Sequence, residues 1–371
     1  MTPFPRNLVR LAILGAALTC ALTPLKGFAW GSVGHTMVAE TAALVLEREM
    51  PKTWGPLLGR HRVEMGFYST LPDSTFRYND GPKKLDRPTH YFDVDVAFQL
   101  EPNSPALAKA KQDFPRGYAD AKKFLKAKKI DVDTVGSALW RAEQFQYLSW
   151  KQFKTVKKPE GAYVQGKAVN GETRAVFNGL FYLGLLAHYT ADVTMPLHST
   201  IDWNAYKSGQ GGIHFYYENE CVDSLEPGLS GDVLELALSK KESWLKKWNA
   251  ENDTLAGVVL SVITESYEIL PSVLELDREK FILQIAKPLE HHDAKRKPAK
   301  EACPALKSHL VEQLAKASVL TAHAWKQVLP TQVDMSKAQT LRFADLEQDI
   351  KFVAPAYEFP AEYYQTMKKV Q

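Results

Sequence analysis

The segment of residues 176–198 reads VFNGLFYLGLLAHYTADVTMPLH. Its leucines and aromatic residues, and the absence of proline before Pro196, predict a buried helix over residues 173–194. Proline lacks the backbone N–H that a helix interior needs, so Pro196 should end this helix. The segment is therefore expected to lie in the interior of the fold.

Metal-ligand residues interrupt this apolar stretch and the chain that follows it. His188 and Asp192 are four residues apart, so both side chains leave the same helix face. His198 should project from the turn after the helix, and His214 and Glu218 repeat the four-residue interval. A single buried His or Asp is more often a hydrogen-bonded core residue, but five so close together favour one site. Histidine and carboxylate ligands without thiolate are typical of catalytic zinc, so we expect an enzyme.

Residues 1–29 have the pattern of a secretory signal peptide. Arg6 and Arg10 precede the apolar stretch LAILGAALTCALTPL, and Gly27 and Ala29 are small residues at the third-last and last positions of the segment. Cleavage after Ala29 is expected, which predicts a secreted or periplasmic protein. The apolar stretch is too short for a membrane span, and no later run approaches about 18 apolar residues, so no integral membrane span is expected.

Cleavage there would make Trp30 the first residue, followed shortly by His35. A free α-amino group has a pKa of about 7.7 to 8, so a metal ion can displace its proton at small cost. The amino nitrogen and carbonyl oxygen of Trp30 could then chelate a metal. The alternative is that Trp30 only caps a hydrophobic core, while His35 opens an amphipathic helix to about Met50.

Several motifs in order resemble the zinc-dependent phospholipase C and S1/P1 nuclease superfamily. They are Trp-Gly-x-x-Gly-His at residues 30–35, HYFD at His90, the block over 188–198, and GGIHFYYENECVD at 211–223. The resemblance implies an all-α fold with a zinc cluster in a cleft and three zinc ions. The implied ligands are Asp73, His90, His188 and Asp192 for one zinc; His198, His214 and Glu218 for a second; and Trp30, His35 and a bridging Asp192 for the third.

Asp73 is the ligand whose assignment involves a choice. It lies in FYSTLPDSTFRYND, where Asp80 is the alternative. The residues after Asp73 lead into a loop as in related chains, whereas Asp80 stands beside Gly81 and Pro82, a combination typical of a turn. We expect Asp73 to orient the attacking water or accept its proton. Arg77 could contact a phosphate, although a surface arginine is the more common interpretation of such a residue.

The resemblance implies hydrolysis of a phosphate ester by metal-activated water, but it leaves the substrate open. The Trp30 to His35 interval and the HYFD motif look like the nuclease branch, which cleaves single-stranded DNA or RNA. The block FYLGLLAHYTADVTMPLH and the compact spacing of His198, His214 and Glu218 look like the phospholipase C branch. This second match is longer, and it favours cleavage of phospholipid headgroups.

Aromatic residues beside the ligands do not decide the substrate. They could stack on a base or hold a choline-type cation, and they are Tyr91, Phe92, Phe215, Tyr216 and Tyr217. Once Arg6, Arg10 and Lys26 leave with the signal peptide, 43 acidic residues face as many basic ones. This balance gives no nucleic-acid footprint. A secreted zinc-binding protein without turnover is a third possibility, and its signature would be a lost ligand.

The remaining sequence predicts one all-α domain over residues 30–371, with the ligands in 30–223 and a helical part in 224–371. Further helices are expected at 34–49, 105–127, 136–153, 231–248, 254–270, 274–287 and 305–328. Residues 287–300 are expected to form a solvated loop in which His291 and His292 are surface residues. Cys221 and Cys303 can pair in an oxidising compartment. A monomer is expected.

Overall fold

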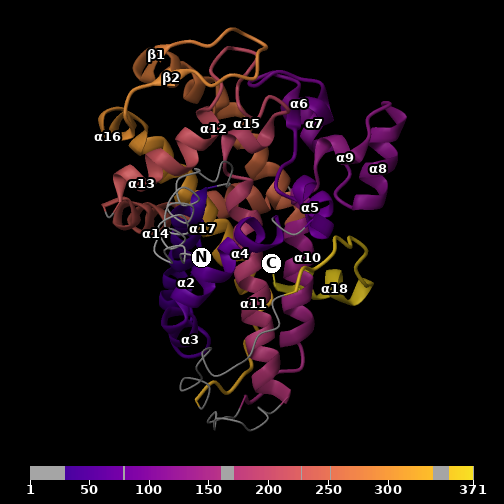
Figure 1. Ribbon diagram of the computed structural model, residues 1–371. Helices are drawn as coiled ribbons and strands as arrows, with labels where there is room; N and C mark the ends of the chain where they lie inside the picture. Colours follow the sequence, from indigo (N-terminus) through magenta and orange to yellow (C-terminus); the bar gives the residue numbers. More distant parts are fainter. Residues whose placement is uncertain are drawn as a thin grey trace, which may run out of the picture.

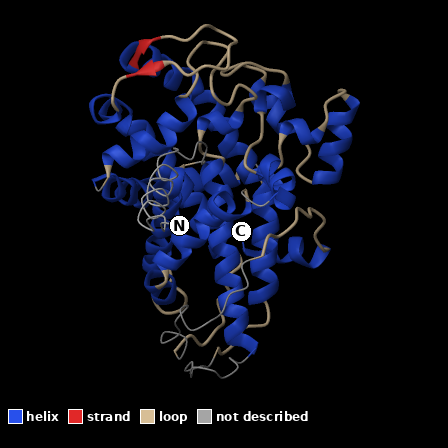
Figure 2. Ribbon diagram, in the orientation of Figure 1, coloured by secondary structure: helices blue, strands red, loops and turns tan. Residues whose placement is uncertain are grey.

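The computed structural model describes residues 30–77, 80–159, 171–226, 228–250, 252–336 and 351–370. Within these ranges the fold is built from helices, and the strands are confined to one two-stranded antiparallel sheet (Figure 2). The prediction of an all-α protein is thereby confirmed. The predicted signal peptide falls on residues 1–29, outside the described residues.

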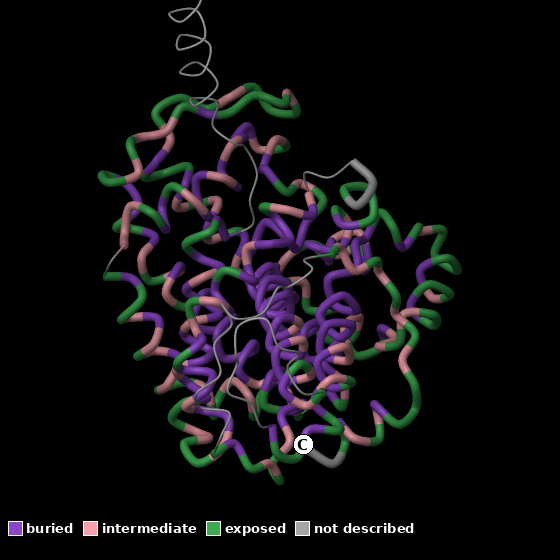
Figure 3. Tube along the Cα trace, turned by 60° about the horizontal axis from the view of Figure 1, so that its bottom comes forward, coloured by how far each residue is buried: buried purple, intermediate pink, exposed green. Residues whose placement is uncertain are grey.

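Helix α11 (Gly171–Asp192) is the predicted apolar helix, and nearly all its residues from Val176 onward are buried. It packs against α10 (Ala138–Phe153), α4 (Arg62–Leu71), α2 (Gly31–Glu49) and α17 (Lys307–Lys326) (Figure 1). The buried residues are concentrated around these helices (Figure 3). The metal-ligand residues of α11 therefore sit near the end of a largely buried helix.

Glycines on α11 allow its neighbours to approach closely. A Cβ on Gly179 would lie 2.3 Å from the Phe153 ring, and one on Gly184 would lie 2.5 Å from the Tyr68 Cβ. The helix ends at Asp192, and Pro196 begins the next turn, as expected. Close packing on two sides fixes the axis of α11 and hence the direction of its last side chains.

The other elements surround this core. The short ones before α11 are α3 (Gly55–Arg60), η1 (Pro72–Phe76), α5 (Asp80–Asp86), η2 (Arg87–Thr89), α6 (Val94–Phe98), α7 (Leu107–Asp113), α8 (Tyr118–Ala127) and α9 (Val132–Val135). Those after it are η3 (Pro196–Ser199), α12 (Ile213–Phe215), η4 (Tyr216–Glu220), α13 (Cys221–Leu225), α14 (Gly228–Asn249), α15 (Leu255–Leu276), η5 (Asp277–Phe281), β1 (Ile282–Gln284), β2 (Lys295–Arg296), α16 (Ala299–Ala302), η6 (Cys303–Leu306) and α18 (Ala361–Val370).

Two predicted helices are wrong. The helix expected at 105–127 is divided into α7 and α8, because Phe114 is extended before Pro115 and a residue before proline avoids the helical conformation. The helix expected at 274–287 ends in the π-helical turn η5, and Ile282 then enters strand β1, opposite Arg296. The solvated loop expected at 287–300 includes strand β2.

Helix α15 and its continuation η5 have the length and mean hydropathy of a membrane span, but 67% of the apolar window is buried inside the protein. A core helix of a soluble protein has the same composition, so this feature is weak evidence for a span. In the structure α15 packs against α10 and the turn η3, which carries His198. Its apolar surface therefore supports the chain next to the ligands.

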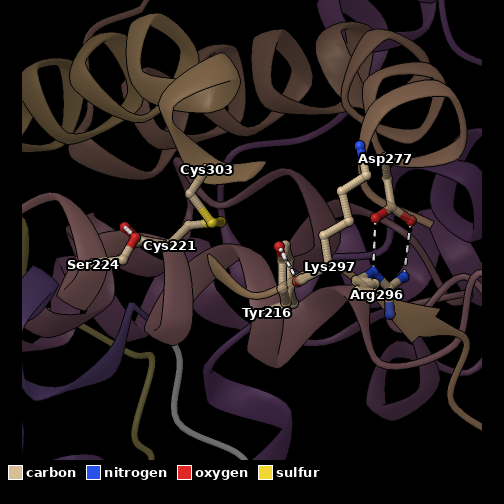
Figure 4. The surroundings of a disulfide bond; sticks show 7 residues. All are labelled: Tyr216, Cys221, Ser224, Asp277, Arg296, Lys297 and Cys303. Carbon is tan, nitrogen blue, oxygen red and sulfur yellow. Dashed lines mark hydrogen bonds and ion pairs between the residues drawn. A yellow bond between two sulfur atoms is a disulfide. The ribbon is translucent and has the colours of Figure 1, made fainter. Parts of the chain in front are cut away.

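A disulfide and a buried ion pair hold the segments beyond α11 together (Figure 4). Cys221 is bonded to Cys303, so the structure pairs the two cysteines whose pairing the sequence left open. Arg296 contacts both carboxylate oxygens of Asp277, at 2.7 and 2.8 Å, and also donates to the carbonyl oxygens of Gln210 and Gly211. The loop before α12 is thus fixed to a segment far away in the sequence.

Candidate metal centre

The predicted ligand residues converge on one buried region near the end of α11. They come from separate elements: His35 from α2, Asp73 from η1, His90 after η2, His188 and Asp192 from α11, His198 from η3, His214 from α12, and Glu218 from η4. Their donor atoms form three groups in which all atoms lie within 4.8 Å of one another. The groups are His35, His188 and Asp192; Asp73, His90 and His188; and His198, His214 and Glu218.

His188 and His90 lie with one ring nitrogen of each directed at the other. His188 donates from Nδ1 to the carbonyl oxygen of Ser69 at 2.8 Å, which leaves Nε2 as an acceptor. His90 donates from Nε2 to the Asp86 carboxylate at 2.8 Å, and its Nδ1 lies 2.9 Å from Nε2 of His188. An oxygen of Asp192 lies 2.9 Å and 3.2 Å from these two nitrogens. Such a convergence of acceptors needs a cation or a proton at its centre.

The electrostatics of this group depend on its carboxylates. Burial lowers the pKa of His90, but Asp86 and Asp192 outweigh burial and raise the pKa of this imidazole to about 10. Burial also opposes the charge on Asp192, yet His188 and His90 hold its pKa well below the usual value. A metal ion that binds here must therefore displace a proton from His90.

In the group of His198, His214 and Glu218, each histidine also has one ring nitrogen bound to a protein acceptor and the other directed into the cluster. His198 donates from Nδ1 to the carbonyl oxygen of His90 at 2.9 Å, and His214 donates to that of Trp203 at 2.8 Å. Their Nε2 atoms lie 3.3 Å apart, and a Glu218 oxygen lies 3.0 Å from Nε2 of His214. Burial lowers the pKa of His198 to about 3 and raises that of Glu218 to about 7. Backbone carbonyls that fix ring orientation in this way are typical of metal-ligating histidines.

His35 completes a third group around Asp192. Its Nε2 lies 3.5 Å from the Oδ1 of Asp192, and its ring stacks on His188 at a centroid distance of 4.0 Å. Within the described part of the chain, neither His35 ring nitrogen has a hydrogen-bond partner, nor does Oδ1 of Asp192 or Oδ2 of Asp73. Buried polar atoms are nearly always hydrogen-bonded. A neutral imidazole has one acceptor nitrogen, and such a nitrogen beside two unpaired carboxylate oxygens fits a site for cations.

Trp30 lies beside the ligands with its side chain fully buried. Its indole nitrogen donates to the carbonyl oxygen of Ala191 at 2.8 Å, so the packing role considered from the sequence is present. Its backbone nitrogen lies 3.2 Å from a Glu218 oxygen. That nitrogen is an amide in the full-length chain and would become an amino group only after cleavage at Ala29. The backbone nitrogen of Trp30 is therefore within reach of Glu218, whereas the resemblance implies that Trp30 shares a zinc with His35.

The structure also locates the residues proposed to act on the substrate. Asp73 is buried in the cluster, with Oδ1 3.8 Å from Nδ1 of His90, while the side chain of Asp80 lies outside the described residues. Arg77 is 29% exposed and its guanidinium contacts Asp73 at 3.2 Å, so it connects the cluster with solvent. Tyr91 lines a separate pocket, among whose described lining residues there are no cluster ligands.

Two residues that were not predicted from the sequence contact the proposed ligands. Asp86 is fully buried and contacts His90, the Tyr189 hydroxyl at 3.2 Å and the Arg141 guanidinium at 3.8 Å. The sequence carries a signal for it, because Asp86 stands four residues before His90, the same interval as His188 to Asp192. Asn204 was also missed, and its side chain accepts from the backbone N–H of His214.

A pocket of about 780 Å³ opens beside the second ligand group. His214 contributes to its wall, and most other lining residues belong to the loop before α12 and the segment before α16. The aromatic and imidazole side chains among them are Trp203, Tyr206, Phe215, Tyr216, His291 and His292. A substrate could therefore reach the cluster from this side and be bound by flat side chains.

No protein-family model matches this chain, and no curated protein is significantly similar to it. Imidazole and carboxylate donors suit zinc and several other divalent ions. Cys221 and Cys303 are bonded to each other, so neither offers a thiolate to the cluster.

Proposed function

We propose that the protein is a zinc-dependent phosphodiester hydrolase of the superfamily that its motifs resemble. Its reaction would be phospholipase C-like cleavage of phospholipid headgroups. The main support is the convergence of three His and carboxylate groups, whose buried acceptor atoms are directed at one another. A core polar network would instead pair each acceptor with a donor. Three zinc ions would satisfy these atoms, with Asp192 between the sets that contain His35 and His90.

The side chains define the work that the protein itself would do. Bound zinc would supply Lewis-acid stabilisation of phosphate charge and lower the pKa of water. Asp73 lies within the cluster, where it would orient the attacking water or accept its proton. Arg77 holds Asp73 from the solvent side and would bind a phosphate oxygen when the substrate enters. Burial of the ligands excludes bulk water from the reacting groups.

The decisive experiment uses the mature chain, beginning at Trp30, with three substrates in parallel. Phosphatidylcholine vesicles, single-stranded DNA and single-stranded RNA are each incubated with and without a zinc chelator. We expect chelator-sensitive release of phosphocholine. Release of nucleotides instead would support the nuclease alternative, and no product from any substrate would support a zinc-binding protein without turnover.

Two histidine variants separate metal loss from general damage. His188→Ala removes a nitrogen shared by two ligand groups, so zinc content and hydrolysis should fall together. His61→Ala is the matched control, because His61 is also buried but lies near Glu64 and belongs to none of the three groups. Equal zinc content in the two variants would contradict the proposed ligand set.

A further inference from the structure

Large exposed apolar side chains gather at one end of the molecule, on two segments that we call the apical loops. The apical loops are residues 201–212 and 282–298, and the labels β1 and β2 mark the second of them in Figure 1. Their exposed apolar residues are between 46% and 74% exposed: Ile201, Trp203, Leu283, Ile285 and Leu289. Several large apolar side chains exposed on the same two segments of a folded protein point to an interaction site.

The apical loops are joined to each other, so this exposure belongs to a defined structure. Ala286 donates to the carbonyl oxygen of Gly209 at 2.9 Å, and Leu289 donates to that of Tyr206 at 2.8 Å. The Arg296 guanidinium donates to the carbonyl oxygens of Gln210 and Gly211 in the first loop. It also contacts Asp277 (Figure 4). The apolar side chains therefore project from apical loops that are held together by hydrogen bonds.

The conformation and exposure of Leu289 are not explained by packing within the chain. Its backbone has φ +67°, a left-handed conformation that suits glycine or asparagine and that a leucine adopts only at a cost. Its side chain is 74% exposed and so gains little from packing within the chain. A strained, exposed leucine at a loop tip indicates an apolar partner outside the chain.

The chemistry around these side chains matches a phospholipid surface. The side chain of Arg296 is buried in its ion pair with Asp277, and the remaining basic residues of the loops still outnumber the acidic ones: Lys207, Lys287, Lys295 and Lys297 against Asp202, Glu290 and Asp293. Positive charge beside apolar side chains favours membranes that contain anionic lipid. Trp203 and Tyr206 add side chains of the kind that prefer the membrane–water interface.

We propose that the apical loops insert their apolar side chains into the surface of a phospholipid bilayer and so bring headgroups to the pocket beside His214. Trp203 and Tyr206 belong both to the apical loops and to the wall of that pocket. Docking at the loops would therefore place the pocket at the level of the headgroups. This inference rests on the proposed phospholipase C-like function, whose substrate lies in such a surface.

Trp203 offers a direct measurement of docking, because the other tryptophans are buried or half-buried. The zinc-loaded protein is mixed with vesicles of phosphatidylcholine and phosphatidylglycerol that carry brominated acyl chains. We expect quenching of the emission, and Trp203→Phe should remove most of it. Absence of quenching in the wild type would overturn the proposal, as would equal quenching in Trp203→Phe.

Leu289→Gly tests the role of the apical loops in docking, because it should weaken vesicle binding without lowering stability. Glycine relieves the left-handed backbone, so thermal stability should be unchanged or higher. Loss of the inserted side chain should weaken vesicle affinity by roughly tenfold or more. Val63→Gly is the control for loss of an exposed apolar side chain, since Val63 is 57% exposed on α4, outside the apical loops. Wild-type vesicle affinity in Leu289→Gly would overturn the proposal.

Hydrolysis of a soluble phosphodiester separates this proposal from the proposed function. Leu289→Gly should cleave monomeric short-chain phosphatidylcholine at the wild-type rate but cleave vesicles more slowly. Vesicle binding without hydrolysis of any lipid would support docking and contradict the proposed function. Hydrolysis of soluble substrate by a protein that binds no vesicles would contradict docking alone. If single-stranded DNA quenches Trp203 and vesicles do not, the apical loops bind nucleic acid and the proposal fails.

Discussion

Replacing Asp86 by asparagine should weaken zinc binding although Asp86 is not itself proposed as a ligand. Its carboxylate accepts from Nε2 of His90 and thereby directs Nδ1 into the cluster. Burial would raise the pKa of Asp86, but the positive charges of His90 and Arg141 hold the pKa below its usual value. Asp86→Asn keeps the size of the side chain and removes the charge on which both neighbours depend.

Asp86→Asn should change both the free energy of unfolding and the zinc affinity. Arg141 is fully buried, so loss of the opposite charge should cost about 3 to 5 kcal/mol of the free energy of unfolding. Weaker orientation and lower basicity of His90 should reduce zinc affinity by about 10- to 100-fold. The first effect is measured by urea unfolding, and the second by competition with a fluorescent zinc chelator under conditions where the variant is folded.

Glu265→Gln is the matched control. Glu265 is largely buried and accepts from the Trp248 indole at 3.1 Å and from Lys247 at 2.9 Å, with Lys316 at 3.5 Å. It contacts no proposed ligand in these interactions, so its loss should lower stability and leave zinc affinity unchanged. If Asp86→Asn lowered stability like this control and bound zinc like the wild type, the role of Asp86 in orienting His90 would be refuted.

Three further predictions follow from the cluster and the disulfide. Zinc must displace the proton that His90 holds below pH about 10, so zinc affinity should fall by up to about tenfold per pH unit below that value. Calorimetry in buffers of different ionisation enthalpy would detect the released proton, and zinc affinity that does not depend on pH would contradict this prediction. Asp73→Asn should lower hydrolysis by about 10²- to 10⁴-fold, measured beside zinc content, and an unchanged rate would remove Asp73 from the mechanism. Cys303→Ser opens a covalent loop with a sequence separation of 82 and should lower the free energy of unfolding by about 4 kcal/mol, whereas an unchanged urea midpoint would argue against any stabilising effect of the disulfide.

The sequence predicted the helices where apolar pattern and helix ends agreed. The helix expected at 173–194 is α11, and the one expected at 254–270 begins at Leu255 as predicted. The prediction failed at 274–287, because Leu283 and Ile285 have the composition of a buried helix face but are exposed in the apical loops. Periodicity indicates which residues are apolar, and it cannot tell whether their partner lies inside the chain or outside it.

The candidate site was predictable where residue type and spacing carry the information. The proposed ligands fall into three groups, but the atoms that orient their rings are mostly backbone carbonyls of Ser69, His90 and Trp203. Every residue has such a carbonyl, so no sequence pattern marks those positions. Asp86 could have been suspected from its interval to His90, whereas its contact with Arg141 is purely tertiary.

The C-terminal part of the chain supports the cluster without contributing a proposed ligand. Arg296 fixes the carbonyl oxygens of Gln210 and Gly211, which lie four and three residues before His214, and the disulfide holds Cys221, three residues after Glu218. The second ligand group is therefore held at both ends by segments beyond residue 276. The resemblance ended at residue 223 and gave the remainder no role in the site. Because Arg296 and the Gln210 and Gly211 carbonyls belong to the apical loops, displacing these loops should disturb the group of His198, His214 and Glu218 before the group that contains His188.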